Sequence, residues 1–238
     1  MIRHPCEDPI GQSISNYFHL GDNSPVKVIS SMVEDEELPP DYFFRKHNDM
    51  PLLERIALKR SSGSILDVGA GAGCHSLYLQ EKKKHVTALE VSTLCCNVMQ
   101  KRGIHHVINE DIFDIKIKSF DTILLLMNGI GIAGNLSRLP DLLHCLKKIL
   151  APGGSILLDS SDLIYLYEQE NGSYSIDINA DHYYGEIDYQ LEYRSMKSPP
   201  FSWLFVDHVL LKDIAETCGL RFRIVEYGPH YDYLAELK

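Results

Sequence analysis

"SILDVGAGAGCHSLYLQ", residues 64–80, joins a strand-like segment to a helix-like segment through a glycine-rich turn. It begins with apolar residues typical of a buried strand and ends with residues typical of a helix. Between the two, Asp67 is followed by glycines at alternate positions, Gly69, Gly71 and Gly73. Glycines at such a turn permit positive φ and let a ligand lie against the backbone, and the start of the next helix favours a negative group. The stretch therefore predicts a ligand site that includes a carboxylate at the end of a buried strand.

Strand-like and helix-like segments alternate beyond this loop. Ser92 is a suitable N-cap for the second helix, and Gly103 is a suitable end for it. Strands that alternate with helices of about a dozen residues predict a parallel sheet with helices on both faces. The expected strands are 64–68, 85–91, 105–111, 120–127 and 155–161, and the expected helices are 74–82, 92–103 and 139–154.

The N-terminal part of the chain has a different pattern. Residues 1–60 contain an acidic run that ends in two prolines at Pro40. Apolar residues at roughly helical spacing in Asp41–Arg60 predict a helix, and Pro51 suits a first helical turn. We expect residues 1–60 to form an N-terminal segment with lid helices, ahead of a main domain over residues 61–238.

The pattern changes again after Ile164, where aromatic residues alternate with polar ones. This composition predicts a β-ribbon, inserted at about residues 170–206 and packed at one edge of the sheet. A helix over 208–220 follows. The chain then reads as two strands joined at residues 228–230, which predicts an antiparallel hairpin at its end.

The composition excludes several classes of protein. The 238 residues carry a net charge of −10, which argues against a broad face for binding nucleic acid. The longest apolar run, Thr122–Met127, is far too short to span a membrane. No apolar core of a signal peptide is visible near the first residue, and the six cysteines lack metal-binding spacing. We therefore expect a cytoplasmic protein without a membrane segment or a zinc site.

The glycine spacing favours one cofactor over another. A dinucleotide fingerprint has glycines at its first, third and sixth positions, but here the sixth position is Cys74. A carboxylate at Asp67 would also repel a pyrophosphate, whereas it suits a cationic amine. S-adenosylmethionine carries such an amine, a carboxylate for the helix start and a cationic sulfonium. A nicotinamide-dependent oxidoreductase stays open as the less favoured alternative.

Two more acids stand at the ends of the next strands. Glu90 ends the second strand, where its two oxygens suit the vicinal hydroxyls of a ribose. Asp111 follows the third strand, where it is placed to accept a hydrogen bond from the adenine amino group, with Ile112 and Phe113 beside the ring. Three acids at the ends of three successive strands are hard to attribute to chance.

With these residues in place, the sequence resembles the class I S-adenosylmethionine-dependent methyltransferases. The matching motifs are LDVGAGAG (66–73), Glu90, Asp111, FDTILLLMNGIG (120–131) and LKKILAPGGSILLD (146–159). The resemblance is strong over residues 64–160 and looser over 219–238. It implies a doubly wound, Rossmann-like α/β fold with a seven-stranded sheet whose last strand is reversed. It also implies in-line transfer of the sulfonium methyl group to a nucleophile, without a fixed catalytic residue.

The resemblance and the pattern together give a set of candidate cofactor-binding residues. Tyr42 and Arg45 are expected to close over the methionine end of the cofactor, with Arg45 paired to its carboxylate. The other candidates are Asp67, Gly69, Ala70, Gly71, Glu90, Val91, Asp111, Ile112, Met127 and Asn128.

The methyl acceptor is expected to be a small molecule. Enzymes of this kind that methylate amines of nucleic-acid bases usually carry an Asn/Asp-Pro-Pro-aromatic turn, and here the turn is Met127-Asn128-Gly129-Ile130. A protein that binds the cofactor without transferring the methyl group stays open as an alternative. The sequence leaves the acceptor and the oligomeric state open. The candidates for acceptor contacts are Asn128, His182, Tyr183, Tyr184, Trp203, His230 and Tyr231.

Overall fold

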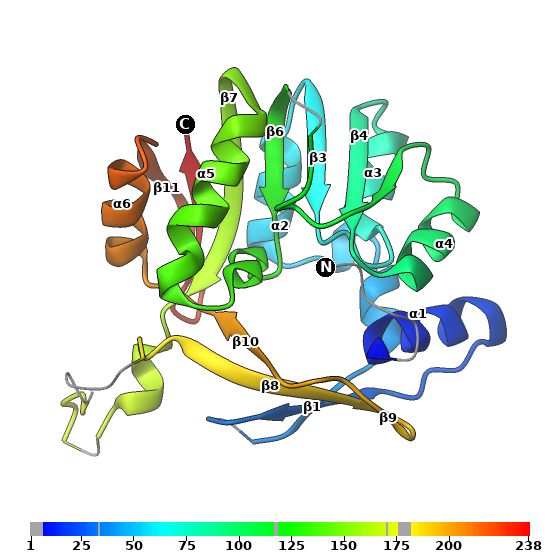
Figure 1. Cartoon of the computed structure of the whole chain (residues 1–238), viewed down its shortest axis with the longest axis horizontal. Coiled ribbons are helices and arrows are strands. Elements are labelled where there is room, and N and C mark those ends of the chain that lie inside the picture. The colour runs from blue at the N-terminus through cyan, green and yellow to red at the C-terminus, as the bar shows by residue number, and fades with distance from the viewer. Residues whose placement is uncertain (1–6, 33, 117–118, 170, 176–181) are drawn as a thin grey trace.

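The computed structural model describes residues 7–32, 34–116, 119–169, 171–175 and 182–238, which form two sheets. The larger, seven-stranded sheet has the order β11-β12-β7-β6-β3-β4-β5 (Figure 1). Its β12 is antiparallel to both neighbours, and its other neighbouring pairs are parallel, as the sequence predicted. Its strands are β3 (Ser64–Val68), β4 (His85–Glu90), β5 (Val107–Asn109), β6 (Phe120–Leu125), β7 (Leu150–Ser161), β11 (Phe222–Tyr227) and β12 (Asp232–Leu237).

Helices cover both faces of this main sheet (Figure 1). Side chains alternate between the faces because successive residues of a strand point to opposite sides. Leu66 of β3 packs with α5 and α6, whereas Ile65 packs with α2 and α3. The helices are α2 (Leu52–Arg60), α3 (Cys74–Glu81), α4 (Thr93–Lys101), α5 (Leu139–Ile149) and α6 (His208–Thr217).

The helix boundaries follow the capping residues. Ser92 is the N-cap of α4, and its side chain accepts a hydrogen bond from the Cys95 amide. Asp207 caps α6 in the same way, by accepting from Val209 N and Leu210 N. These side chains satisfy amides that the first turn of a helix leaves unpaired.

A second sheet contains both the N-terminal strands and the insertion. It has the order β10-β8-β1-β2, with β9 paired to β8. We call it the covering sheet, because it lies across the carboxyl ends of the main-sheet strands (Figure 1). Its strands are β1 (Val26–Ser30), β2 (Glu36–Leu38), β8 (Glu186–Tyr193), β9 (Met196–Lys197) and β10 (Phe201–Leu204).

The covering sheet corrects two expectations. The insertion is not a ribbon at the edge of the main sheet, because β8 pairs with β1 through Lys27–Ser30 and Tyr189–Glu192. The N-terminal segment is not purely helical either. It contains α1 (Pro9–Leu20), two strands and short 3-10 turns, η2 (Pro40–Phe44) and η3 (His47–Asp49), ahead of α2. Sequence periodicity is local, whereas this pairing joins segments about 160 residues apart, so no local pattern predicted it.

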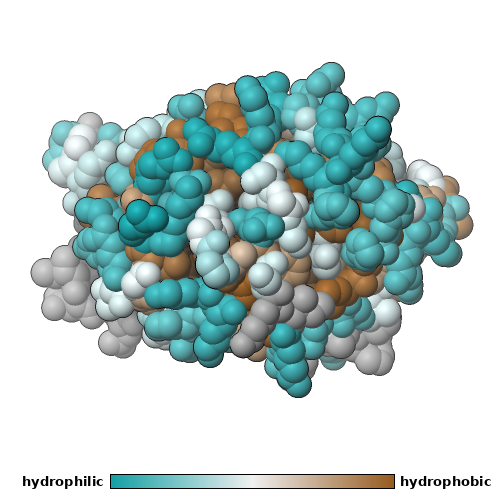
Figure 2. Space-filling view, turned by 90° about the horizontal axis from the view of Figure 1, so that it is seen from above, coloured by the Kyte–Doolittle hydropathy of each residue, from teal (hydrophilic) through white to brown (hydrophobic). Residues whose placement is uncertain are grey.

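The opposite end of the molecule lies above the amino ends of the main-sheet strands. Hydrophilic side chains cover most of it, and hydrophobic side chains show only between them (Figure 2). Among the described residues, no helix is long and apolar enough to cross a membrane.

Candidate functional site

A cavity of about 1030 Å³ lies between the carboxyl edge of the main sheet and the covering sheet. Ligands of doubly wound proteins bind at this edge, and the volume is at the upper end of the usual range for small-molecule sites. The cavity wall includes the glycine loop, the ends of β4 and β5, the turn after β6 and the inner face of the covering sheet.

The glycine loop has the conformation that its sequence requires. Gly69, Gly71 and Gly73 have φ values of 70°, 57° and 81°, a region that glycine adopts without steric cost. A Cβ on Gly73 would lie 2.2 Å from the Ile104 side chain. The Gly69 amide donates to Leu89 O at 2.9 Å, which fixes the loop against β4. The loop thus presents backbone at Gly69 and Gly71, and only the methyl group of Ala70 between them, to the cavity.

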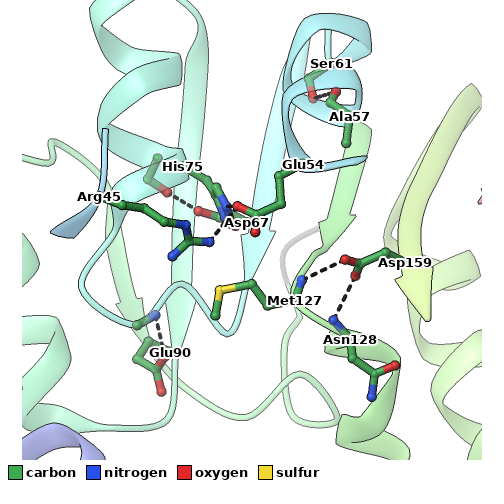
Figure 3. A network of polar contacts seen from close by, with 12 residues as sticks. Arg45, Glu54, Ala57, Ser61, Asp67, His75, Glu90, Met127, Asn128 and Asp159 are labelled. Carbon is green, nitrogen blue, oxygen red and sulfur yellow. Dashed lines mark hydrogen bonds and ion pairs between the residues drawn. The ribbon is translucent and has the colours of Figure 1, made fainter. Parts of the chain in front are cut away.

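Glu90 connects this loop to the start of α4. Its Oε2 accepts from Gly71 N at 2.8 Å (Figure 3), and its Oε1 accepts from Ser92 N at 2.9 Å. Burial raises the pKa of Glu90, while these amide bonds act in the opposite direction. A carboxylate oxygen can accept more than one hydrogen bond. Glu90 therefore retains acceptor capacity on the side that lines the cavity.

Asp67 belongs to a buried chain of alternating charges beneath the loop (Figure 3). Its Oδ2 accepts from Ser76 Oγ at 2.7 Å, and its Oδ1 lies 3.9 Å from His75 Nδ1. The other ring nitrogen, His75 Nε2, lies 2.6 Å from Glu54 Oε2, which also pairs with Arg45 Nη2 at 2.5 Å. We call Arg45, Glu54, His75 and Asp67 the charge cluster.

The surroundings set the protonation of the charge cluster. Burial alone would lower the pKa of His75, but Cys74, Glu54 and Asp67 outweigh it and hold the pKa well above its usual value. Burial also works against the Glu54 carboxylate, yet His75 and Arg45 lower its pKa. For Asp67, burial dominates and raises the pKa despite His75 and Ser76. An additional cationic group beside Asp67 would therefore stabilise its charged form.

The lid residues lie differently from the expectation. Phe43 lines the cavity, whereas Tyr42 and Arg45 are not part of the cavity wall. Arg45 is held by Glu54 and by Tyr42 O, to which Nη1 donates at 2.7 Å. Its Nε is buried and has no hydrogen-bond partner among the described residues.

Asp111 and Ile112 line the cavity beyond β5, beside Phe113. The Phe113 amide donates to Asp111 Oδ1 at 3.1 Å, and the guanidinium of Arg138 lies 5.0 Å from the centre of the Phe113 ring. Of the twelve candidate cofactor residues, the ones that line the cavity are Asp67, Gly69, Ala70, Gly71, Glu90, Val91, Asp111, Ile112, Met127 and Asn128. Their contact with a cofactor stays a prediction.

Sequence reasoning missed Asp8, which brings α1 to the cavity. Its carboxylate accepts from Gly11 N at 2.9 Å as the N-cap of α1, and it also accepts a short hydrogen bond from Ser92 Oγ. Asp8 lines the cavity close to Glu90. No sequence motif marks this contact, because it joins the N-caps of two helices far apart in the chain.

Sequence reasoning also missed Asp159, on β7. Its two oxygens accept from Met127 N at 3.2 Å and from Asn128 N at 2.8 Å (Figure 3). Both amides belong to the turn after β6, where Met127 and Asn128 have positive φ values of 61° and 54°. Left-handed backbone in consecutive non-glycine residues is a signal of function that only a structure can reveal.

The covering sheet contributes a row of aromatic side chains to the cavity. The ring centres of Tyr189 and Phe201 are 6.2 Å apart, and those of Phe201 and Trp203 are 6.3 Å apart. Trp203 lies directly on the backbone of Gly131, where a Cβ would come within 2.0 Å of the indole nitrogen. This row and the carboxylate of Glu36 face the main sheet across the cavity.

Several candidates for acceptor contacts lie away from the cavity. Tyr183 OH donates to Asp207 at 2.8 Å, and Tyr184 OH donates to Asp162 at 2.7 Å. Both hydroxyls therefore have protein partners away from the cavity. The cavity wall, as far as the described residues show it, also lacks three exposed candidates: His182, His230 and Tyr231.

Within the described part of the chain, no group of three or more His, Cys, Asp or Glu side chains is placed to hold a metal ion. The part of the N-terminal segment before residue 7 and parts of the insertion lie outside the described residues.

Comparisons with known proteins agree with this geometry. A family model described as a methyltransferase domain matches residues 65–154. The crystal structure of an S-adenosylmethionine-dependent methyltransferase from Bacteroides fragilis, in complex with S-adenosyl-L-homocysteine, is 42% identical. The match covers 100% of this chain and 97% of the Bacteroides fragilis chain, with a TM-score of 0.93.

More distant structures share the fold. DhpI, in a complex with S-adenosylmethionine and HEP, is 16% identical over 78% of this chain and 83% of its own, with a TM-score of 0.59. The sugar N-methyltransferase KedS8 from Streptoalloteichus sp. is 16% identical, over 82% of this chain and 87% of its own, with a TM-score of 0.55. No curated protein matches the chain.

Proposed function

This chain belongs to the S-adenosylmethionine-dependent methyltransferases, and from that premise we propose that it methylates a small molecule held between its two sheets. One observation carries the proposal: the covering sheet lies across the carboxyl edge of the main sheet and encloses a cavity of about 1030 Å³. An acceptor has to fit inside this space beside the cofactor. The family membership removes the support for a nicotinamide-dependent oxidoreductase.

The residues present fit S-adenosylmethionine. Gly69 and Gly71 offer room for a ligand against the backbone, and Glu90 keeps acceptor capacity toward the cavity. We propose that Glu90 binds the ribose hydroxyls and that Asp111 accepts from the adenine amino group. Ile112 provides an apolar surface beside the ring.

The charge cluster is proposed to bind the amino-acid end of the cofactor. Asp67 would accept from its amine, directly or through one water, because Asp67 lines the cavity and a further cation beside it would stabilise its charged form. Arg45 does not line the cavity and is held by Glu54 and Tyr42 O, so a direct pairing with the cofactor's carboxylate would require Arg45 to change partners.

When bound, S-adenosylmethionine supplies an activated methyl group on a sulfonium, which a nucleophile of the acceptor displaces in line. The task of the protein is then mainly orientation, which is worth on the order of 7–11 kcal/mol in favourable cases. The aromatic row of Tyr189, Phe201 and Trp203 is proposed to pack against the acceptor on the side opposite the cofactor.

Charge supports a small acceptor over a nucleic acid. The net charge is −10, and the cavity wall contains Glu34, Glu36 and Glu37 from the covering-sheet side. These carboxylates would repel a polyanion that approached the opening.

A thermal-shift panel tests the cofactor, because a ligand that binds only the folded state stabilises it. At about one hundred times the Kd, S-adenosylmethionine and S-adenosylhomocysteine should each raise the Tm by roughly 5–10 °C. NAD and NADP should leave the Tm unchanged. A shift with NADP alone would contradict the proposal.

Incubation with methyl-labelled S-adenosylmethionine and a cell lysate tests the acceptor. After separation by size, we expect the label in the small-molecule fraction. Label in the RNA, DNA or protein fraction would contradict a small-molecule acceptor. Cofactor binding without transfer to any fraction would favour a binding protein without activity.

A further inference from the structure

The turn after β6 connects the two walls of the cavity. The Asn128 side chain donates from Nδ2 to Leu204 O of β10 at 3.0 Å, and its Oδ1 accepts from Ser160 Oγ at 2.7 Å. Ser160 Oγ in turn accepts from Val206 N at 3.1 Å. Asn128 therefore ties the main sheet to the segment that follows Trp203 in the covering sheet.

Asp159 fixes the backbone of the same turn. Its carboxylate is half-buried and accepts from the amides of Met127 and Asn128, both in left-handed conformation. The Asn128 carbonyl continues the chain of bonds by accepting from Gly131 N at 3.0 Å. Gly131 is the residue on which the Trp203 indole rests.

These bonds use the polar groups of Asn128. Its amide N–H, its carbonyl oxygen and both ends of its side chain have protein partners. Asn128 therefore holds the two walls together through bonds at each of its polar groups. Met127, in contrast, directs its side chain toward Arg45 and Glu90 (Figure 3) and lines the cavity.

We propose that Asp159 and Asn128 are positioning residues that hold Met127 on one wall and Trp203 on the other in a fixed relation, as methyl transfer requires. We call the two residues the turn clasp. The proposal rests on the proposed function, because it assigns these residues to the cavity where the cofactor and the acceptor meet.

The protonation of Asp159 gives the clasp a measurable signature. Burial raises the pKa of Asp159 to about 7, although the amides of Asn128 and Met127 act in the opposite direction. Two further titratable groups that influence it are Glu54 of α2 and His75 of α3. Tyr42 of η2 and Tyr233 of β12 also lie within its electrostatic reach.

The sign of the effect follows from the hydrogen bonds. The ionised carboxylate accepts from both amides, whereas the protonated form has one weakened acceptor. Ionisation therefore favours the left-handed turn, and the clasp should tighten as the pH rises through about 7.

Trp203 is the single tryptophan of the chain, so its fluorescence reports on the covering-sheet wall. In the unmodified protein we expect S-adenosylhomocysteine to bind about fivefold to tenfold more tightly at pH 8 than at pH 6. Acrylamide should quench Trp203 less at the higher pH. The Asp159→Asn variant presents an amide NH₂ to one of the two N–H donors. It should bind about tenfold more weakly at pH 8 and lose most of the pH dependence.

Two variants separate the conformation of Asn128 from its side-chain bonds. Asn128→Gly keeps a residue that adopts positive φ, whereas Asn128→Ala loses both the conformation and the bonds. Both should increase the quenching of Trp203 and shift its emission to longer wavelength. Asn128→Ala should also weaken S-adenosylhomocysteine binding several-fold more than Asn128→Gly does.

The outcomes distinguish this inference from the proposed function. If the unmodified protein binds no S-adenosylhomocysteine at pH 8, the proposed function fails. If it binds, but Asp159→Asn keeps the affinity and pH dependence of the unmodified protein, the clasp is overturned. Unchanged Trp203 quenching in a folded Asn128→Gly variant would overturn it as well. The pH titration of the unmodified protein tests the clasp even if the variants fail to fold.

Discussion

The two walls of the cavity are held in different ways. On the main-sheet wall, acidic groups hold the structure: Asp67 and Glu90 are buried, Asp159 is half-buried, and each accepts hydrogen bonds from neighbouring residues. On the covering-sheet wall, packing of apolar and aromatic side chains such as Leu191 and Trp203 dominates. The main-sheet wall therefore depends on electrostatics, whereas the covering-sheet wall depends more on shape.

The difference has a physical consequence. A buried charge that loses its partner is costly, so the main-sheet wall tolerates little change. Aromatic packing against a ligand tolerates volume-conserving substitution. Substitutions on each wall test this contrast.

Glu54→Ala should have the largest effect on stability. Its carboxylate pairs with both Arg45 and His75 and is nearly buried. Removing it leaves the Arg45 charge uncompensated, while His75 can lose its proton and so limit the damage. We expect a loss of about 3–5 kcal/mol in the free energy of unfolding, measured by urea denaturation.

Glu81→Ala is the matched control, because Glu81 is exposed at the end of α3. It should change stability by no more than about 0.5 kcal/mol. If Glu54→Ala were as mild as this control, the charge cluster would not be what holds the main-sheet wall.

Glu90→Ala should weaken S-adenosylmethionine binding by roughly 1.5–3 kcal/mol, because hydrogen bonds to a charged acceptor are lost while the ribose stays buried. Isothermal calorimetry measures the change. Glu226→Ala, on the exposed face of β11, removes the same charge far from the cavity and should leave the affinity unchanged. An unchanged affinity in Glu90→Ala would show that Glu90 is not the ribose ligand.

Much of the main-sheet wall was predictable from the sequence, because its signals are local. Strand–turn–helix periodicity predicted the parallel sheet and the terminal antiparallel hairpin, and the resemblance implied the seven-stranded sheet with its reversed last strand, β12. The same signals placed Asp67, Glu90 and Asp111 at strand ends, and all three line the cavity.

The covering-sheet wall was not predictable, because its pairing is not local. β1 and β8 are far apart in the chain, and β1 has only five residues. Asp159 was missed for a related reason: its partners are the amides of a turn 31 and 32 residues earlier. An aspartate at the end of a strand has no sequence feature that reveals such a pairing.

Asp67→Asn tests the recognition of the amine and should have a smaller effect than Glu90→Ala. It keeps the shape and the bond from Ser76 while removing the charge, so we expect a loss of about 1–2 kcal/mol in binding. S-adenosylmethionine and S-adenosylhomocysteine should be affected alike, because both carry the amine. Adenosine binding should be nearly unchanged.

The alternative for Asp67 is a purely structural role. In that case the substitution would lower the Tm of the free protein and weaken all three ligands equally. Equal losses for adenosine in calorimetric titrations would therefore reject the assignment of Asp67 to the amine.

The smallest predicted effect concerns the covering sheet and asks whether the two sheets unfold together. Tyr193 is buried in β8, and its hydroxyl donates to Asp22 at 2.8 Å and accepts from Asn16 at 3.1 Å. Tyr193→Phe keeps the ring and removes these bonds, which should cost about 0.5–1.5 kcal/mol. Urea denaturation followed by Trp203 fluorescence reports on the covering sheet, and far-UV circular dichroism reports on the whole chain. Because the turn clasp and α1 join the sheets, we expect both transitions to coincide and to shift together in the variant. The Tyr227→Phe control alters an exposed tyrosine and should shift neither. A fluorescence transition at lower urea than the circular dichroism transition would instead mean that the covering sheet opens while the main sheet stays folded.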